Sequence, residues 1–489
     1  MCPGLDRWRT AARGPRLSLQ PFRQGQGKMK TTGYFLSLLL LMTQLAGFAQ
    51  TPFSTSELEA RRQAALAKVP DGIILLRSYS GLKHWDESGF HQDPSFYYFT
   101  GLANIHGAIL ALDGPQKESW LFVAPRQNSF GAELRGFDSI FLDPGAQTEK
   151  ELKIDHVVLW DQFVSFIESR RKNTSKLVLY TDSAGQTGHM SGDASVPQGL
   201  DPMENSHRVW ADMLHRHWPD LEVKDAFAIL DEVRSVKTAE EITRLRQAAA
   251  VTAKGFWAGV HAIGPGRTQR MVEGKVLDAC LEAGSDGPSL WPWVRSGPNT
   301  MGNALFEAFA DYRNMDRKMQ AGEVVRLDVG CDFGMYKGDF GRTIPVSGHF
   351  DEGQQETMEL LNGAYLAGVA VMKPDATAKE VFKATLSYVE QHQSGLKTAM
   401  AKEALADALK KSGFALHGLG VDMAEGIPKV FQAGNVICYE PLFSARGQAF
   451  FVEDTFLITA DGHEVLSPAL PYAPQDIEKS MDQSAHKPH

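Results

Sequence analysis

A short hairpin-like stretch constrains this chain more than any other feature. The sequence "RLDVGCDFGMYKGDFGRT" runs from Arg326 to Thr343 and is typical of a strand, a turn and a second strand. Each predicted strand carries one aspartate, Asp328 in the first and Asp339 in the second. Two carboxylates brought together in a buried hairpin repel each other and lose their hydration, which is costly without a cation between them. The stretch therefore predicts a sheet that holds a divalent cation.

Three more residues suited to metal binding lie further along the chain. Glu440 lies in "VICYEPLF", Glu453 lies in "FFVEDTFLIT", and His417 precedes a glycine-rich turn in "FALHGLGVD". Each alone has an ordinary explanation, as a carboxylate at a strand end or a hydrogen-bonded core histidine. Together with the two aspartates they offer four carboxylates and one imidazole. This donor set favours a pair of ions, with Mn²⁺ the most natural choice and Zn²⁺ or Co²⁺ also suitable.

The order and spacing of these five residues resemble the pita-bread metallopeptidases, which include methionine aminopeptidase, prolidase and aminopeptidase P. The family pattern has an Asp, an Asp eleven residues later, a His before a turn, a Glu followed by Pro, and a Glu followed by Asp. The resemblance implies that Asp339 and Glu453 bridge two ions. Asp328 would complete the first ion, while His417 and Glu440 would complete the second. It also implies that Glu440 is the general base of peptide hydrolysis.

The N-terminal half indicates the branch of the family. The stretch "FHQDPSFYYFTGL" (Phe90–Leu102) resembles the aminopeptidase P signature. Strands alternating with helices predict an α/β domain, which by resemblance is creatinase/prolidase-like, followed by an α+β pita-bread catalytic domain. The strands of this second domain are expected to be mostly antiparallel. The predicted divisions are a leader over 1–49, the α/β domain over 50–228, the catalytic domain over 229–472 and a polar, unstructured tail over 473–489.

Local patterns add further expectations. The aromatic run "SFYYFTGL" predicts a strand over 95–102. Thr238 before "AEEITRL" predicts the start of a long helix. Three more helices are expected around 355–372, 378–394 and 398–412. Residues 280, 331 and 438 are the only cysteines after the leader, and their odd number and scattered spacing predict neither a disulfide framework nor a cysteine-type zinc site.

The sequence departs from the family pattern at three positions. A His-Tyr pair expected seventeen residues before the first Asp is replaced by Asp311 and Tyr312. A His expected seven residues after the ligand His is replaced by Ala424, and an Arg two residues before the last Glu is replaced by Phe451. Asp311 and Tyr312 remain candidate catalytic residues, because a carboxylate at position 311 could hold the free amine of a substrate.

These departures leave several functions open. One is an enzyme with altered specificity, and another is an ordinary aminopeptidase acting on Xaa-Pro peptides. A third is a prolidase-like dipeptidase, and a fourth is a metal-binding homologue whose catalysis is impaired and whose role is binding. Each of the enzyme readings implies short peptides as substrates and a homo-oligomer, dimer or tetramer.

The N-terminus predicts export. Lysines precede an apolar run of about a dozen residues, and Gly47 and Ala49 suit a cleavage site, which is typical of a signal peptide over about residues 29–49. A secreted or periplasmic protein, without membrane attachment after cleavage, is therefore expected. Removing residues 1–49 changes the formal net charge from −9 to −15, because seven Lys or Arg and one Asp are lost. So acidic a chain is a poor nucleic-acid binder.

Overall fold

The structure is a computed structural model. It describes residues 53–79, 91–125, 141–174, 176–183, 206–301, 315–468 and 470–482. The predicted signal peptide and the candidate residues Asp311 and Tyr312 lie outside these residues.

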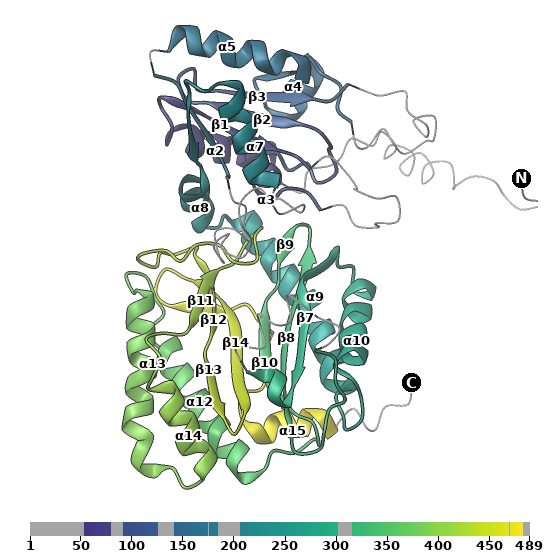
Figure 1. The fold of residues 1–489 in the computed structure, drawn as a ribbon, viewed down its shortest axis with the longest axis vertical. Coiled ribbons are helices and arrows are strands. Elements are labelled where there is room, and N and C mark those ends of the chain that lie inside the picture. Colours follow the sequence, from purple (N-terminus) through teal and green to yellow (C-terminus); the bar gives the residue numbers. More distant parts are fainter. Residues whose placement is uncertain are drawn as a thin grey trace, which may run out of the picture. The chain divides into compact units, whose positions relative to one another are not determined.

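A six-stranded mixed sheet lies in the N-terminal half of the described chain (Figure 1). Its strand order is β4-β3-β2-β1-β5-β6. Strands β1 and β2 pair antiparallel, whereas β1 and β5 pair parallel. This mixture, with helices between the strands, confirms the predicted α/β class. The strands are β1 (Gly72–Arg77), β2 (Ile109–Asp113), β3 (Glu118–Val123), β4 (His156–Leu159), β5 (Val178–Thr181) and β6 (Glu222–Asp225). The helices are α2 (Thr55–Leu66), α3 (Pro94–Thr100), α4 (Ala146–Leu152), α5 (Phe163–Asn173), α7 (Ser206–His217) and α8 (Phe227–Ser235).

The strand predicted over 95–102 is wrong, because most of this segment forms helix α3. Asp93 is the N-cap, and its side chain accepts a hydrogen bond of 2.7 Å from the backbone N–H of Phe96. Pro94 occupies the first helical position, where its missing N–H costs nothing. Gly101 ends the helix in the left-handed region, at φ 69°. These helix signals outweigh the strand preference of the aromatic run.

A nine-stranded sheet dominates the C-terminal half, and its main order is β11-β12-β14-β10-β8-β7. Every pairing recorded in this sheet is antiparallel, which confirms the predicted α+β character. Its strands are β7 (Gly287–Ser296), β8 (Val324–Phe333), β9 (Tyr336–Lys337), β10 (Phe340–Pro345), β11 (Ala415–Gly418), β12 (Val436–Glu440), β13 (Leu442–Ala445), β14 (Gln448–Ile458) and β15 (His463–Val465). Strand β14, which comes late in the sequence, lies between β12 and β10 in the middle of the sheet (Figure 1).

Long helices flank this sheet and share one apolar core with it. They are α9 (Ala239–Ala262), α10 (Gln269–Glu282), α12 (Glu352–Val369), α13 (Ala378–His392) and α14 (Ala399–Ala408). The predicted N-cap is confirmed, since Thr238 and Glu241 form a capping box at the start of α9. None of the helices in the described ranges combines the length and the apolar character needed to cross a bilayer.

Side chains alternate between the two faces of the C-terminal sheet, as they must along pleated strands. On β8, Leu327 and Val329 belong to the helix-packed core, and Asp328 between them points to the opposite face. On β14, Val452 belongs to the same core, while its neighbour Glu453 points away from it. The sheet therefore has an apolar face covered by helices and a second face on which carboxylates gather.

The cysteine spacing indicates no disulfide framework, but the structure contains one disulfide. Cys280 of α10 and Cys331 of β8 are joined by a disulfide, although 51 residues separate them in sequence. Packing of α10 near β8 brings the two side chains together, and neither spacing nor motif reveals this contact. Cys438 is a free, buried cysteine.

The tail predicted to be unstructured from residue 473 begins with a helix instead. Helix α15 spans Pro474–Asp482 and buries Ile477 in the core of the C-terminal half. One apolar side chain facing the core supplies a reason for this short polar segment to order. Residues 483–489 lie outside the described ranges.

Candidate metal centre

Strand register brings the two central carboxylates to the same level of the sheet. Gly341 of β10 is paired with Asp328 of β8 on one side and with Glu453 of β14 on the other. Both acidic side chains are on the face opposite the helices, so they approach each other across β10. Glu440 ends strand β12, which pairs with β14, and so reaches the same face.

Asp339 and His417 complete the predicted set, Asp339 from the residue before β10 and His417 from the edge of the sheet. Asp339 immediately precedes β10, not within a strand as predicted, and its carbonyl accepts a hydrogen bond of 2.6 Å from the hydroxyl of Thr455. His417 lies on the edge strand β11, opposite Cys438 of β12. A hydrogen bond from the Thr455 side chain thus holds the backbone of Asp339, and strand pairing positions His417.

The loop after His417 is held by two buried ion pairs from the segment that precedes α9. Arg234 donates to Asp422 at 2.6 Å, and Lys237 donates to Glu425 at 2.6 Å. Each pair buries both charges together, which avoids leaving an isolated charge in the interior. These contacts anchor the turn that returns from β11 and so help to fix the position of His417.

All five predicted ligands meet in two overlapping groups. Asp339, His417, Cys438 and Glu453 form one group, and Asp328, Glu440 and Glu453 form the other, with ligand atoms within 4.8 Å of one another in each. Glu453 belongs to both. Glu440 also approaches the first group, since its Oε1 lies 3.7 Å from Nε2 of His417.

The hydrogen bond at the ring of His417 leaves its other nitrogen suited to bind a metal. Nδ1 lies 3.0 Å from the carbonyl oxygen of Gly418, which places the proton on Nδ1. Nε2 then carries a lone pair and lies 3.6 Å from Oδ2 of Asp339. Burial lowers the pKa of His417, which keeps the ring neutral and available as a ligand.

Electrostatics indicate that the site needs positive charge. Burial raises the pKa of Asp328 to about 6, and it raises the pKa of Asp339 and of Glu453 well above their usual ranges. Repulsion among the neighbouring carboxylates adds to the effect for all three. The pKa of Glu440 is also raised by burial, against the pull of Arg326. Ionising all four carboxylates together is therefore costly, and a divalent cation among them would remove much of that cost.

Two buried carboxylate oxygens that lack hydrogen-bond partners are suited to bind cations. Within the described residues, Oδ1 of Asp328 and Oε2 of Glu453 are buried and have no hydrogen-bond partner. A buried acceptor without a partner is costly, and a metal ion is a natural partner for a carboxylate oxygen. The residues present therefore fit a divalent metal site.

Sequence reasoning missed two residues of this site, Arg326 and Cys438. Arg326 lies two residues before Asp328 on β8, and Cys438 lies two residues before Glu440 on β12. Residues two apart on a strand point to the same face, so this spacing could have identified both. Of the family departures, Ala424 lies on the anchored loop, while Phe451 is buried on β14.

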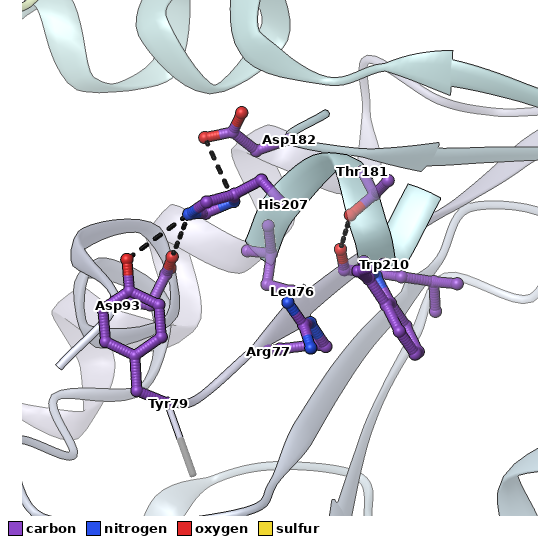
Figure 2. A pocket seen from close by; sticks show the side chains of 9 residues that line it. Leu76, Arg77, Tyr79, Asp93, Thr181, Asp182, His207 and Trp210 are labelled. Atoms are coloured by element: carbon purple, nitrogen blue, oxygen red, sulfur yellow. Dashed lines mark hydrogen bonds and ion pairs between the residues drawn. The ribbon is translucent and has the colours of Figure 1, made fainter. Parts of the chain in front are cut away.

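The aspartate of the N-terminal motif has another environment (Figure 2). Asp93, which caps α3, lies in a small pocket with His207 and Asp182. Nε2 of His207 is 3.6 Å from Oδ2 of Asp93, and Nδ1 is 3.9 Å from Oδ2 of Asp182 (Figure 2). Burial raises the pKa of Asp93 to about 6, which the charge of His207 opposes. The motif thus builds a capped helix and a polar cluster within the N-terminal half.

Two family models match the chain. The metallopeptidase family M24 matches residues 243–460, and the aminopeptidase P N-terminal domain matches residues 58–180. The first match covers all five ligand-type residues, and the second covers the motif around Asp93.

Full-length relatives give the same result. The chain is 24% identical over 467 residues to an Xaa-Pro aminopeptidase of Haemophilus influenzae, covering 90% of this chain and 100% of the relative. It is also 24% identical to an Xaa-Pro aminopeptidase of Escherichia coli over 457 residues, covering 88% of this chain and 98% of the relative.

Solved structures share the fold. Escherichia coli aminopeptidase P with the inhibitor Pro-Leu matches with a TM-score of 0.68 at 23% identity, covering 89% of this chain and all of that chain. Proline aminopeptidase P II of Yersinia pestis matches with a TM-score of 0.67 at 23% identity, covering 88% and 100%. The predicted architecture, a creatinase/prolidase-like N-terminal domain before a pita-bread domain, is therefore confirmed. The matches and the assembled ligand set show that the chain belongs to metallopeptidase family M24 and is related to aminopeptidase P.

Proposed function

We propose that this protein is a dinuclear metallopeptidase that removes the N-terminal residue from short peptides with proline in the second position. The observation that carries the proposal is the pair of ligand groups that share Glu453. A carboxylate common to two adjacent groups is suited to bridge two ions. The names of the full-length relatives, both Xaa-Pro aminopeptidases, support the substrate class.

Each side chain of the site has a role in this proposal. Glu453 and Asp339 would bridge the ions, and Asp328, Glu440 and His417 would complete them. Two bound ions would supply an acidified water and polarisation of the scissile carbonyl. Glu440 would accept the proton of the attacking water and return it to the leaving nitrogen. Burial raises the pKa of Glu440, which favours its uptake of a proton.

The metal is proposed to be Mn²⁺, because hard oxygen donors outnumber the single imidazole. Cys438 adds a softer donor beside His417 in one group, which also suits Zn²⁺ or Co²⁺. Metal analysis of protein purified without added metal, followed by reloading with each ion, separates these choices.

Export and oligomerisation are further parts of the proposal. The signal peptide over about residues 29–49 would direct the chain to the periplasm or outside the cell. The disulfide between Cys280 and Cys331 supports an oxidising compartment, where such bonds persist. A homo-oligomer, dimer or tetramer, is also proposed, and light scattering of the mature chain would measure it.

The test of the proposal combines metal content with turnover. Wild type should hold two ions per chain and cleave a short Xaa-Pro peptide. Asp339→Ala should lose both ions, because the residue is proposed to bridge them. Asp332→Ala is the matched control: Asp332 lies in the same hairpin, but its carboxylate accepts from Lys337 at 2.6 Å and belongs to neither ligand group. Full metal content in Asp339→Ala would refute the bridging role.

Because Asp311 and Ala424 replace the family histidines, two alternative functions are also considered. One is a prolidase-like dipeptidase, and the other is a catalytically impaired metal-binding homologue. A dipeptidase would cleave Xaa-Pro dipeptides in preference to longer peptides, so a substrate length series distinguishes it. If impairment is real, Asp311→His with Ala424→His should raise turnover, by up to about 10²–10³ for each restored oxyanion donor. If Asp311 instead holds the substrate amine, Asp311→Asn should weaken binding of free-amine peptides and spare N-acetylated ones.

A further inference from the structure

Arg326 donates hydrogen bonds to the side-chain carboxylates of two candidate ligands. Its Nη2 donates to Oδ2 of Asp328 at 3.0 Å and to Oε2 of Glu440 at 3.3 Å. The two carboxylates come from different strands, β8 and β12, and both belong to the same ligand group. One guanidinium therefore ties together two ligands that the backbone does not pair directly.

Aromatic rings hold this guanidinium in place. Its Cζ lies 4.1 Å from the ring centre of Phe451 and 5.7 Å from that of Trp293. The positively charged plane is attracted to both rings, and the low exposure of the side chain strengthens that attraction. Strand β10 lies between β8, which carries Arg326, and β14, which carries Phe451. Its residue Thr343 is paired with Arg326, and the Thr343 hydroxyl accepts a hydrogen bond of 2.6 Å from the N–H of Phe451. Arg326 and Phe451 are thus neighbours across a single strand.

Arg326 donates to one of the two oxygens in the carboxylate of Asp328 and in that of Glu440. On Asp328, Oδ2 accepts from the guanidinium and Oδ1 is the buried oxygen without a partner. On Glu440, Oε2 accepts from the guanidinium and Oε1 faces His417 at 3.7 Å. In both residues one oxygen is occupied and the other remains for a metal ion.

We propose that Arg326 is a positioning residue that makes Asp328 and Glu440 single-oxygen ligands. By holding one oxygen of each carboxylate, it turns the other oxygen toward the ions and prevents two-oxygen binding. Groups that hydrogen-bond to metal ligands commonly contribute about 10–100-fold to metal affinity. The inference deepens the proposed function and rests on its metal site.

A competing account makes the opposite prediction. Arg326 could merely neutralise the carboxylates in place of the ions, and the ions would then displace it. Removing it would eliminate a competing cation, and metal affinity would rise or stay the same. The direction of the change in affinity therefore separates positioning from charge compensation.

The experiment titrates the metal-free, full-length mature protein with Co²⁺, using calorimetry for affinity and visible absorption for coordination geometry. Arg326→Met removes the charge at similar volume, and Arg326→Lys keeps the charge without the planar fork. Co²⁺ affinity should fall about 10–100-fold in Arg326→Met, with a smaller loss in Arg326→Lys. The absorption spectrum should change in both variants, because two-oxygen binding raises the coordination number.

Arg295→Lys is the matched control. Arg295 is paired with Arg326 across strands β7 and β8, is more deeply buried than Arg326, and donates to Glu273 at 3.3 Å, which is not a member of either ligand group. This variant should keep the wild-type affinity and spectrum. Circular dichroism checks that each variant folds. If Arg326→Met does not fold, the visible absorption spectrum of Co²⁺-loaded Arg326→Lys tests the positioning role.

The outcomes separate this inference from the proposed function. If the wild-type protein takes up no Co²⁺, the proposed metal site itself is wrong. If the wild type binds two ions and both Arg326 variants bind them as tightly with an unchanged spectrum, only the positioning role is refuted. Higher affinity in Arg326→Met would establish the charge-compensation account instead.

Discussion

Gly341 offers a strict test of the strand spacing on which the metal centre depends. It lies on β10 between Asp328 and Glu453, with which it is paired on its two sides. A Cβ added at this position would lie 2.7 Å from the carbonyl oxygen of Leu327, 3.0 Å from Cα of Asp328 and 2.4 Å from a ring carbon of Phe451. Two of these atoms belong to the backbone of β8, which is held on its far side by β7. Gly341→Ala must therefore shift a ligand-bearing strand.

The expected cost follows from these contacts. Forcing one extra carbon into a packed interior destabilises a protein by about 1–3 kcal/mol. Replacing glycine by alanine also makes the unfolded chain less flexible. This stabilises the folded state by about 0.4–1 kcal/mol where the backbone conformation suits alanine. We expect a net loss of about 1–2 kcal/mol in the free energy of unfolding. Metal affinity should fall as well, because Asp328 and Glu453 are the residues paired with the substituted one.

The same substitution at Gly274 should act in the opposite direction. Gly274 is exposed in the interior of α10, and a Cβ there meets no atom within 4 Å. Gly274→Ala should gain about 0.5–1 kcal/mol from improved helix propensity. Urea unfolding of both variants, metal-free, compares the transition of the C-terminal half. If Gly341→Ala proved as stable as Gly274→Ala, β8 would be free to move away from β10. The tight spacing between these two strands would then be refuted.

Three further predictions concern pH, a buried ion pair and processing. In the metal-free protein the pKa of Asp328 is raised by burial to about 6, so the folded state binds the extra proton. Stability should therefore decline as pH rises from about 4 to about 6, by about 3 kcal/mol for this group alone, and metal should remove the decline. Urea unfolding with and without chelator measures it, and a metal-free protein that gains stability over this range would contradict it. Asp454→Asn should cost about 3–5 kcal/mol in unfolding free energy, because Arg342 donates to both carboxylate oxygens at 3.0 Å and would be left buried without a counter-charge; a loss below 1 kcal/mol would be evidence against the pair. Mass spectrometry of protein from its native host should find an N-terminus at or near Gln50, and a retained apolar segment would show that the leader is not cleaved.

The ligand set was predictable because its signal is local. A carboxylate in an apolar segment conflicts with burial, and four such carboxylates with one histidine at family spacing point to one site. The structure brings Asp328, Asp339, His417, Glu440 and Glu453 together on one face, as this reasoning requires. Their individual roles as bridges, ligands and base remain predictions, as do the exact domain boundaries.

Arg326 was harder to recognise, because a single charge beside an acidic residue has many ordinary explanations. Its partner Glu440 lies 114 residues away in sequence, and only the order of strands in the sheet brings them together. The disulfide between Cys280 and Cys331 escaped prediction for the same reason, since helix packing determines it. Contacts between distant segments depend on the tertiary fold, which spacing alone does not reveal.

Helix α3 shows a different kind of failure. Aromatic residues favour strands when they pack on a pleated surface, and the strand predicted over 95–102 rests on that preference. Asp93 and Pro94 at the start of the run are specific helix signals, however, and the cap hydrogen bond to Phe96 realises them. Local capping chemistry can therefore decide a short apolar segment against its average propensity.

The central place of β14 has a consequence for the order of events during folding. As the chain is synthesised, β7, β8 and β10 emerge first and present Asp328 and Asp339 together, well before Glu453 exists. β11 and β12 emerge next, but they cannot join these strands, because their places in the sheet are on the other side of β14. A nascent chain would thus carry two incomplete halves of the site until one late strand unites them. The complete metal centre would therefore form only as a last step, once β14 is in place.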